Sequence, residues 1–436
     1  MMSNKRKERG HFFAGLRKQG GGLVLLMVLA WLCCCTSTAL GAGFALMNQG
    51  TEAMAQGNAF VAEADNASAI FYNPAGLSQL KRPQFYQGSF LTYPDREFQG
   101  TGQFAETVSR VYPTVTAYFA YPINDRVALG LGFFSPFGLG SSWPAEWAGR
   151  YLITYSTLKT YNVNPVASVK LLDNLSLAAG VDVMWSAVRM KKKIPMPFGL
   201  PDGESNLGGD GNGVGYNLGV LYEPLGGLKL GVAYRSEIFV KHKGDLATTL
   251  PSPLASPSNI GGSANITYPP TVTMGINYSR LKPFTFELDA TWTGWSTYDE
   301  LRVTLDKPIF VNGVLTNSLV TPKNWHDTWA FRFGANYEVK EGMKVRAGYI
   351  YDLTPVPSGS FDPQLPDANR HVFSVGGDLK IKRFTLGVAY NYILIEGRSK
   401  SNTITTNGVG PPAAFQANGP YRSDVHILGL SWSFQF

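Results

Sequence analysis

The chain has 436 residues, of which 44% are hydrophobic and only 16% are charged, below the ~25% charged content usual for soluble domains. Beyond the N-terminus, no apolar run approaches the ~20 residues that a membrane-spanning helix needs. These features exclude a helical membrane protein. The formal net charge of +7 is concentrated near the N-terminus, so it does not indicate a nucleic-acid partner.

Residues 1–41 are expected to form a secretory signal peptide. Six basic residues come before the apolar run "LVLLMVLAWL" at 23–32, and small residues follow it, with cleavage expected after Gly41. Cleavage would remove six basic residues and one acidic residue, leaving a net charge of +2, and would remove all three cysteines (33–35). A retained anchor and a lipid-anchored Cys33 are alternatives, disfavoured by the short run and by the "AWL" before Cys33.

Residues 42–83 are expected to form a plug inside a barrel. They carry small residues, few charges and helix-like pieces, and Asp65 is expected to cap a short helix beginning at Asn66. The segment "DNASAIFYNPAG" (65–76) has neither strand alternation nor metal ligands. Such a segment is too apolar for a free linker, so the interior is its expected place.

Residues 84–436 alternate between apolar and polar side chains, as in "FTFELDATW" (284–292), "LKLGVAYR" (228–235) and "LGLSWSFQF" (428–436). A period of two places each set on one face of a sheet. The connections alternate in length as well. Six short turns lie near Pro122, Asp173, Pro224, Lys282, Glu341 and Lys382, and seven long loops lie at 94–110, 135–158, 189–212, 241–267, 296–325, 353–369 and 397–420.

Six turns and seven loops join fourteen strands, and this arrangement predicts an all-β, antiparallel outer-membrane barrel, with lipid-facing residues outside and polar residues inside. A soluble all-β protein is the alternative.

No catalytic motif is found. His242, His326, His371 and His426 have no partner at a metal-ligand spacing, and "GDGNGVG" (209–215) lacks the Lys-Ser/Thr ending of a phosphate loop, so it is expected to be a flexible loop entering a strand. We expect no enzyme activity, no cofactor and no metal. An outer-membrane hydrolase is an alternative, since a missing motif alone does not exclude it.

The loop at 134–153 is unusually apolar. Its large side chains are expected to form an exposed patch that binds substrate, the alternative being that they pack together to cap the barrel. These residues are Phe134, Phe137, Leu139, Trp143, Trp147, Tyr151 and Leu152.

Four stretches resemble the FadL/TodX family of outer-membrane transporters of long-chain fatty acids and other hydrophobic compounds. They are "AGFALMNQG" (42–50), "DNASAIFYNPAGLSQL" (65–80), "FSPFGLGSSW" (134–143) and "VRAGYIYDLTPVPSGSFDPQLPDANRHVFSVG" (345–376). The resemblance covers nearly the whole chain after the leader. It implies a fourteen-stranded barrel with an N-terminal hatch in the lumen.

The resemblance also implies a route: capture in the outer loops, a pocket at the hatch, and lateral exit through the wall. It assigns substrate contacts to Phe44, Asn73, Pro74 and Ala75, although a packing turn is an alternative for Asn73 and Pro74. Basic lumen residues would meet a carboxylate, and five are candidates: Lys229, Arg235, Arg332, Lys344 and Arg346.

The lateral opening is expected at Gly130, Gly132 and Pro136, which weaken or interrupt strand pairing; ordinary glycine content is the alternative. The expected function is passive uptake of long-chain fatty acids across the outer membrane of a Gram-negative bacterium, by a monomer surrounded by lipid and lipopolysaccharide. A transporter of aromatic or alkane hydrocarbons and a barrel without transport are the alternatives.

Overall fold

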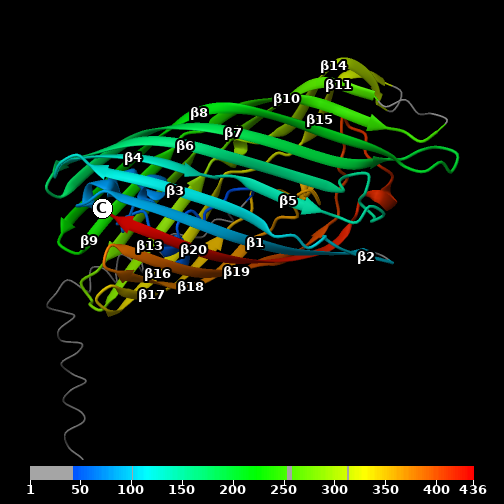
Figure 1. Ribbon diagram of the computed structural model, residues 1–436. Coiled ribbons are helices and arrows are strands. Elements are labelled where there is room, and N and C mark those ends of the chain that lie inside the picture. Colours follow the sequence, from blue (N-terminus) through cyan, green and yellow to red (C-terminus); the bar gives the residue numbers. More distant parts are fainter. Residues whose placement is uncertain (1–42, 101, 253–257, 312–313) are drawn as a thin grey trace, which may run out of the picture. The chain divides into compact units, whose positions relative to one another are not determined.

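The computed structural model describes residues 43–100, 102–252, 258–311 and 314–436, so the expected signal peptide and its cleavage site lie outside the described residues. Fourteen antiparallel strands form a closed barrel, which confirms the predicted fold (Figure 1). The barrel closes where β1 pairs with β20, from Gln84↔Gln435 to Phe98↔Tyr421. The wall strands are β1 (Gln84–Gly100), β3 (Tyr112–Pro122), β4 (Val127–Phe134), β6 (Tyr155–Leu172), β7 (Leu175–Ile194), β8 (Gly203–Leu225), β9 (Leu228–Arg235), β12 (Thr271–Tyr278), β13 (Phe284–Thr293), β16 (Thr328–Lys340), β17 (Met343–Asp352), β18 (Arg370–Ile381), β19 (Phe384–Lys400) and β20 (Gly419–Gln435).

Six further strands lengthen the wall at the end that carries the long connections. β10 pairs with β8 and β11, and β14 pairs with β11 and β15. The further strands are β2 (Gln103–Glu106), β5 (Gly138–Ser142), β10 (Ile238–Thr249), β11 (Ser258–Tyr268), β14 (Glu300–Val311) and β15 (Val314–Pro322). Four segments expected to be loops (94–110, 189–212, 241–267 and 296–325) are therefore largely strand.

The glycine-rich segment 209–215 lies in the interior of β8, so its expected role as a flexible loop is wrong. Each of its residues pairs with β7, from Gly209↔Val188 to Gly215↔Asp182. Main-chain hydrogen bonds to β7 hold this segment in the sheet although its glycines give no apolar–polar alternation.

The apolar and polar residues that alternate in the sequence lie on opposite faces of the wall, as predicted. Leu428, Leu430 and Trp432 of β20 are exposed on the outside, whereas Glu287 and Asp289 of β13 are each 1% exposed and face the lumen. Within the described residues, none of the helices is long and apolar enough to span a membrane.

Residues 43–83, which we call the N-terminal segment, are almost entirely buried and contain α3 (Thr51–Ala55), α4 (Ala69–Tyr72) and the 3₁₀-helix η1 (Pro74–Gln79). Short 3₁₀-helices also occur in the long connections: η2 (Trp295–Thr297), η3 (Ser358–Ser360) and η4 (Ala413–Phe415). The expected cap at Asp65 is wrong. Asp65 is exposed, α4 begins at Ala69, and the Asn66 side chain accepts the hydrogen bond from the Ser68 amide instead.

Candidate functional site

Two buried carboxylates of β13 bind the main chain of the N-terminal segment. Asp289 accepts hydrogen bonds from the amides of Phe60 (2.9 Å) and Val61 (3.1 Å). Glu287 accepts from the amides of Ala62 (2.8 Å) and Glu63 (2.9 Å). Four consecutive amides thus find acceptors on the wall, which explains why this irregular stretch is stable away from water.

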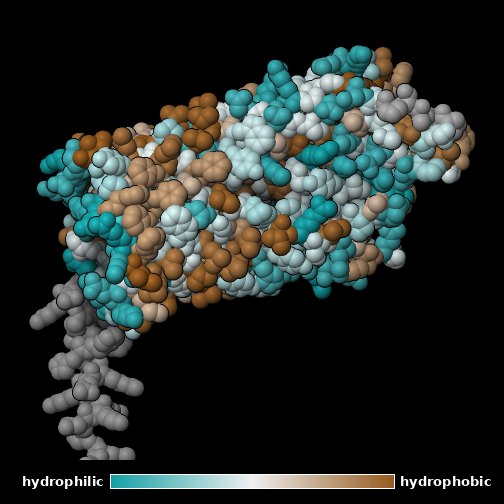
Figure 2. Space-filling view, viewed as in Figure 1, coloured by the Kyte–Doolittle hydropathy of each residue, from teal (hydrophilic) through white to brown (hydrophobic). Residues whose placement is uncertain are grey.

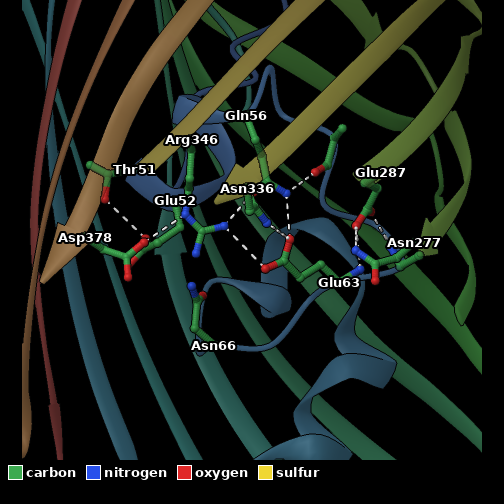
Figure 3. Close-up of polar contacts among 12 residues, drawn as sticks. Thr51, Glu52, Gln56, Glu63, Asn66, Asn277, Glu287, Asn336, Arg346 and Asp378 are labelled. Carbon is green, nitrogen blue, oxygen red and sulfur yellow. Dashed lines mark hydrogen bonds and ion pairs between the residues drawn. The ribbon is translucent and has the colours of Figure 1, made fainter. Parts of the chain in front are cut away.

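A second group of polar residues joins the N-terminal segment to β16, β17 and β18 (Figure 3). Glu63 accepts hydrogen bonds from Gln56 (2.8 Å) and Asn336 (2.9 Å) and pairs with Arg346 (3.3 Å), which also pairs with Asp378 (2.8 Å). Burial alone would raise the pKa of Glu63, but the Arg346 guanidinium and these hydrogen bonds outweigh it and hold this pKa at about 2. Glu63 is therefore ionised at neutral pH and fastens the segment to the wall.

Asn73 is fully buried and its amide makes three hydrogen bonds. Its Nδ2 donates to the carbonyls of Val61 (2.8 Å) and Val220 (3.0 Å), and its Oδ1 accepts from the Ala75 amide (3.2 Å), capping η1. A Cβ at Gly219 would lie 2.4 Å from Asn73 Oδ1, so only glycine fits there. Asn73 and Ala75 are 0% exposed, whereas Pro74 lines a lumen cavity.

Phe44 lies in a cage of aromatic rings. The centroids of Trp295, Trp325, Tyr298, Phe137 and Tyr268 lie 4.7, 5.5, 5.6, 6.0 and 6.1 Å from that of Phe44. The preceding residue is clamped on both sides, since the Gly43 amide donates to Asp367 (3.1 Å) and Arg370 donates to the Gly43 carbonyl (2.9 Å). Gly43 has a φ of +57°, and a side chain there would collide with Trp295.

Residues 44–46 pair with the wall where a ladder stops. β3 pairs with β4 only from Pro122↔Ala128 to Ala117↔Phe133, and among the described residues β5 pairs with β6 alone. Next to this break, the Gly138 amide donates to the Phe44 carbonyl (2.9 Å) and the Leu46 amide to the Pro136 carbonyl (2.8 Å). Pro136 therefore lies at a break in the wall.

Gly130 and Gly132 do not interrupt strand pairing, so that expectation is wrong. Gly130 pairs with Ala120 and Val166, and Gly132 is likewise paired on both sides. A Cβ at either glycine would lie 2.8 Å from Ile70 of the N-terminal segment. These two glycines therefore allow the segment to approach β4 closely.

Two cavities lie on opposite sides of residues 44–46. We call the one toward the long-connection end the upper cavity and the one toward the rest of the N-terminal segment the lower cavity. The upper cavity, about 730 Å³, is mostly apolar and is lined by Phe44, Leu139, Leu158, Met190, Ile266 and Leu305 among others. The lower cavity, about 990 Å³, is lined by residues 45–47 and by Phe71, Pro74, Pro136, Phe137, Arg235 and Arg332.

The expected exposed patch at 134–153 is wrong, because other long connections cover its side chains. Trp143 and Trp147 are each 3% exposed and stack on one another at 4.3 Å, and Trp143 donates to the Pro363 carbonyl (3.0 Å). Tyr151, also buried, packs edge-on against Phe415 at 4.7 Å.

The predicted loop residues divide into three groups. Phe137 and Leu139 lie close to Phe44, and Phe134 packs deeper, on Phe71 (5.2 Å). Trp143, Trp147 and Tyr151 form part of the cap over the long-connection end, and none of the three lines either cavity.

The five basic candidates all face the lumen, but most have partners. Lys229 bonds to Gln79, Arg235 pairs with the buried Asp182, and Arg346 pairs with Glu63. Lys344 lines a separate polar cavity at the short-turn end. Arg332 faces the lower cavity, and its Nε has no hydrogen-bond partner in the described part of the chain.

Sequence reasoning missed the aromatic cage and the Glu63–Arg346 pair. The cage residues Tyr268, Trp295, Tyr298 and Trp325 lie in or beside segments expected to be loops, where no pattern indicates contacts. Glu287 and Asp289 did carry a signal, because acids at inward-facing strand positions need partners, but nothing in the sequence identifies those partners as main-chain amides.

The geometry defines a class of protein: an outer-membrane barrel whose lumen holds its own N-terminal segment and apolar cavities. The particular family follows from comparison with known proteins. Residues 32–436 match the model of the outer membrane protein transport protein family (OMPP1/FadL/TodX), and the chain belongs to this family of hydrophobic-compound transporters. Its members are passive transporters and not enzymes.

Similar proteins support this assignment along most of the chain. The putative outer membrane protein NMB0088 of Neisseria meningitidis is 27% identical, covering 90% of this chain and 94% of the relative. The long-chain fatty acid transport protein of Escherichia coli O6:H1 is 24% identical, covering 78% of this chain and 84% of the relative.

Solved structures show the same fold. A Pseudomonas aeruginosa FadL homologue has a TM-score of 0.78 at 21% identity, covering 91% of this chain and all of that structure. The Ralstonia pickettii toluene transporter TbuX has a TM-score of 0.69 at 18% identity, covering 90% of this chain and all of that structure. Identities this low speak to the fold alone.

Proposed function

We propose that the protein takes up long-chain fatty acids by passive transport through the lumen. A substrate enters the upper cavity from the long-connection end, passes Phe44 into the lower cavity, and leaves sideways at the wall break beside Pro136. The observation that carries this proposal is the pair of cavities on either side of residues 44–46, the lower of which reaches Pro136. We further propose that it acts as a monomer, with residues 42–83 as the hatch.

The site residues divide into contacts and supports under this proposal. Phe44, Pro74, Phe137 and Leu139 contact substrate because they line the cavities. Asn73 and Ala75 hold the turn that presents Pro74.

Arg332 is the proposed partner of a substrate carboxylate. It lines the lower cavity and makes no ion pair in the described part of the chain, its hydrogen bonds going to Thr291 and Met47. A guanidinium binds a carboxylate strongly in a site shielded from water. Aromatic or alkane hydrocarbons are the second candidate substrates, favoured by the predominantly apolar lining of the upper cavity.

Uptake of labelled oleate and labelled toluene by cells with and without the gene tests the proposal. We expect oleate uptake to depend on the gene. Dependence of toluene uptake alone would replace the fatty-acid assignment by the hydrocarbon one, and no difference for either compound would contradict transport.

A further inference from the structure

The outer surface of the barrel carries a groove that transport does not use. It runs across β6, β7, β8 and β10 at the long-connection end and has a volume of about 1,040 Å³. Its walls bear Lys159, Arg189 and Lys243, all exposed, while Ala187 and Gly208 leave space between them. A Cβ on Gly208 would have one neighbour, at 4.0 Å.

The register of the sheet brings these residues into adjacent rows. Lys159 pairs with Ala187, Ala187 with Asp210, and Asp210 with Lys243, which gives one row across four strands. In the next row, Arg189 pairs with Thr157 on β6 and with Gly208 on β8, and Gly208 pairs with Asp245 on β10. Three cations from three strands therefore surround one hollow.

An aromatic row lies directly below the groove. Phe133, Tyr161 and Trp185 are exposed and stack in sequence, with centroid distances of 6.0 and 5.6 Å. Aromatic girdles mark the membrane interface of such barrels. Trp185 itself lines the groove, and Lys159 lies two residues beyond Tyr161 on β6, which is ~7 Å along the strand. The groove therefore extends from the girdle to the level of the lipid head groups.

The surface around the groove is basic on balance. Five cations (Lys159, Arg189, Lys191, Lys193 and Lys243) face three carboxylates (Glu204, Asp210 and Asp245). Glu204 is shared by Lys191 and Lys193, and Asp210 accepts a hydrogen bond from Trp185 (3.3 Å). In the described part of the chain, Lys159 and Lys243 make no ion pair or hydrogen bond, and Arg189 bonds only to the neutral Asn206 (3.1 Å).

We propose that this groove binds the phosphorylated head group of an outer-leaflet lipid. Phosphate oxygens accept charge-assisted hydrogen bonds from lysine and arginine, and a basic cluster beside the membrane surface attracts anionic lipids. The acyl chains of the same molecule lie against the apolar wall below the aromatic row. Figure 2 shows the wall over β6, β7 and β8 changing from hydrophobic to hydrophilic toward the long-connection end.

Native mass spectrometry of the purified full-length protein tests this site. Bis-phosphorylated lipid A and its enzymatically dephosphorylated form serve as probes. We expect the phosphorylated lipid to bind at least tenfold more tightly, and the variant K159Q/R189Q/K243Q to lose this preference. The variant K282Q/K340Q/R383Q, which removes the same charges from the short-turn end, serves as the matched control and is expected to keep it.

Equal binding of the two lipids by the parent protein would overturn the proposal, as would an unchanged preference in K159Q/R189Q/K243Q. The parent comparison needs no substitution, so it stands even where a variant fails to assemble. Heat-dependent migration in SDS gels reports assembly of each variant. Uptake of labelled oleate is expected to be unchanged in K159Q/R189Q/K243Q, which separates this site from the transport route.

Discussion

At the scale of single residues, glycines on the inner face of the wall allow the N-terminal segment to pack closely against the strands. Gly219 and Gly231 lie under the N-terminal segment, and a Cβ on either would come within 2.4 Å of Asn73 Oδ1 or the Val61 carbonyl. Gly226, in a short turn, has open space around it. Glycine therefore allows close packing at Gly219 and Gly231, whereas at Gly226 it lies in a turn with no close neighbour.

The substitution Gly219→Ala is expected to loosen the N-terminal segment, because its methyl group displaces the Asn73 side chain from its three hydrogen bonds. Such a clash costs about 2 kcal/mol. Limited proteolysis at neutral pH should show faster cleavage between residues 43 and 83. Gly226→Ala is the control and should match the parent. Equal cleavage of both variants would show that the segment does not depend on this contact.

At the scale of elements, ionised side chains hold the N-terminal segment to the wall, and this makes its stability depend on pH. The pKa of Glu63 is about 2 in the folded protein against an ordinary value of 4.5. A lowered folded-state pKa stabilises the folded state above the ordinary pKa, and this contribution disappears as the pH falls from about 4.5 to about 2. It is at most about 3 kcal/mol.

Glu63→Gln is therefore expected to lower the denaturant midpoint at pH 7 but to have little effect near pH 2. Guanidinium unfolding followed by tryptophan fluorescence at both pH values measures the two differences. Glu106→Gln, at an exposed position in β2, is the control and should change neither midpoint. A Glu63→Gln effect that is the same at both pH values would contradict ionisation of Glu63 as its source.

Movement of residues 44–46 away from the wall is the step that the proposed route requires. Ala45 and Phe137 form an isolated antiparallel bridge and are a non-hydrogen-bonded pair, whose Cα atoms lie ~4.5 Å apart, within reach of a disulfide. The double variant A45C/F137C is expected to lose at least nine-tenths of oleate uptake when oxidised and to regain it on reduction. The single variants are the controls, and full uptake by the oxidised double variant would rule out this movement.

At the scale of the whole molecule, the ring of wall strands closes without the N-terminal segment. Each of the fourteen wall strands lies beside two others, and none of the ladders between them includes residues 43–50. Deleting Gly43 to Gly50 is therefore expected to leave the barrel assembled, as heat-dependent SDS migration would show. Oleate uptake should fall at least fivefold, because the aromatic cage and the boundary between the cavities are lost. Normal uptake would contradict the role given to this segment.

The fold was largely predictable from the sequence, and the site only in part. A strand that faces lipid on one side and the lumen on the other alternates between apolar and polar side chains. This alternation locates strands such as β13 and β20 and all six short turns. Beyond the membrane no lipid-facing side is required, and the sequence therefore predicts a loop over part of the 23-residue β8. Burial of Trp143 depends on the Pro363 carbonyl, 220 positions away, and no local pattern reports such a contact.

The β1–β20 ladder has a consequence for the order of assembly. The first and last strands of the wall are the ones that join, over fifteen residue pairs from Gln84↔Gln435 to Phe98↔Tyr421. No closed ring exists until the last strand is in place. The N-terminal segment is covalently continuous with β1, so the growing wall can curl around it, and no threading through a finished pore is needed. Early contacts with β13 and β17 would then act as a template on which the ring closes.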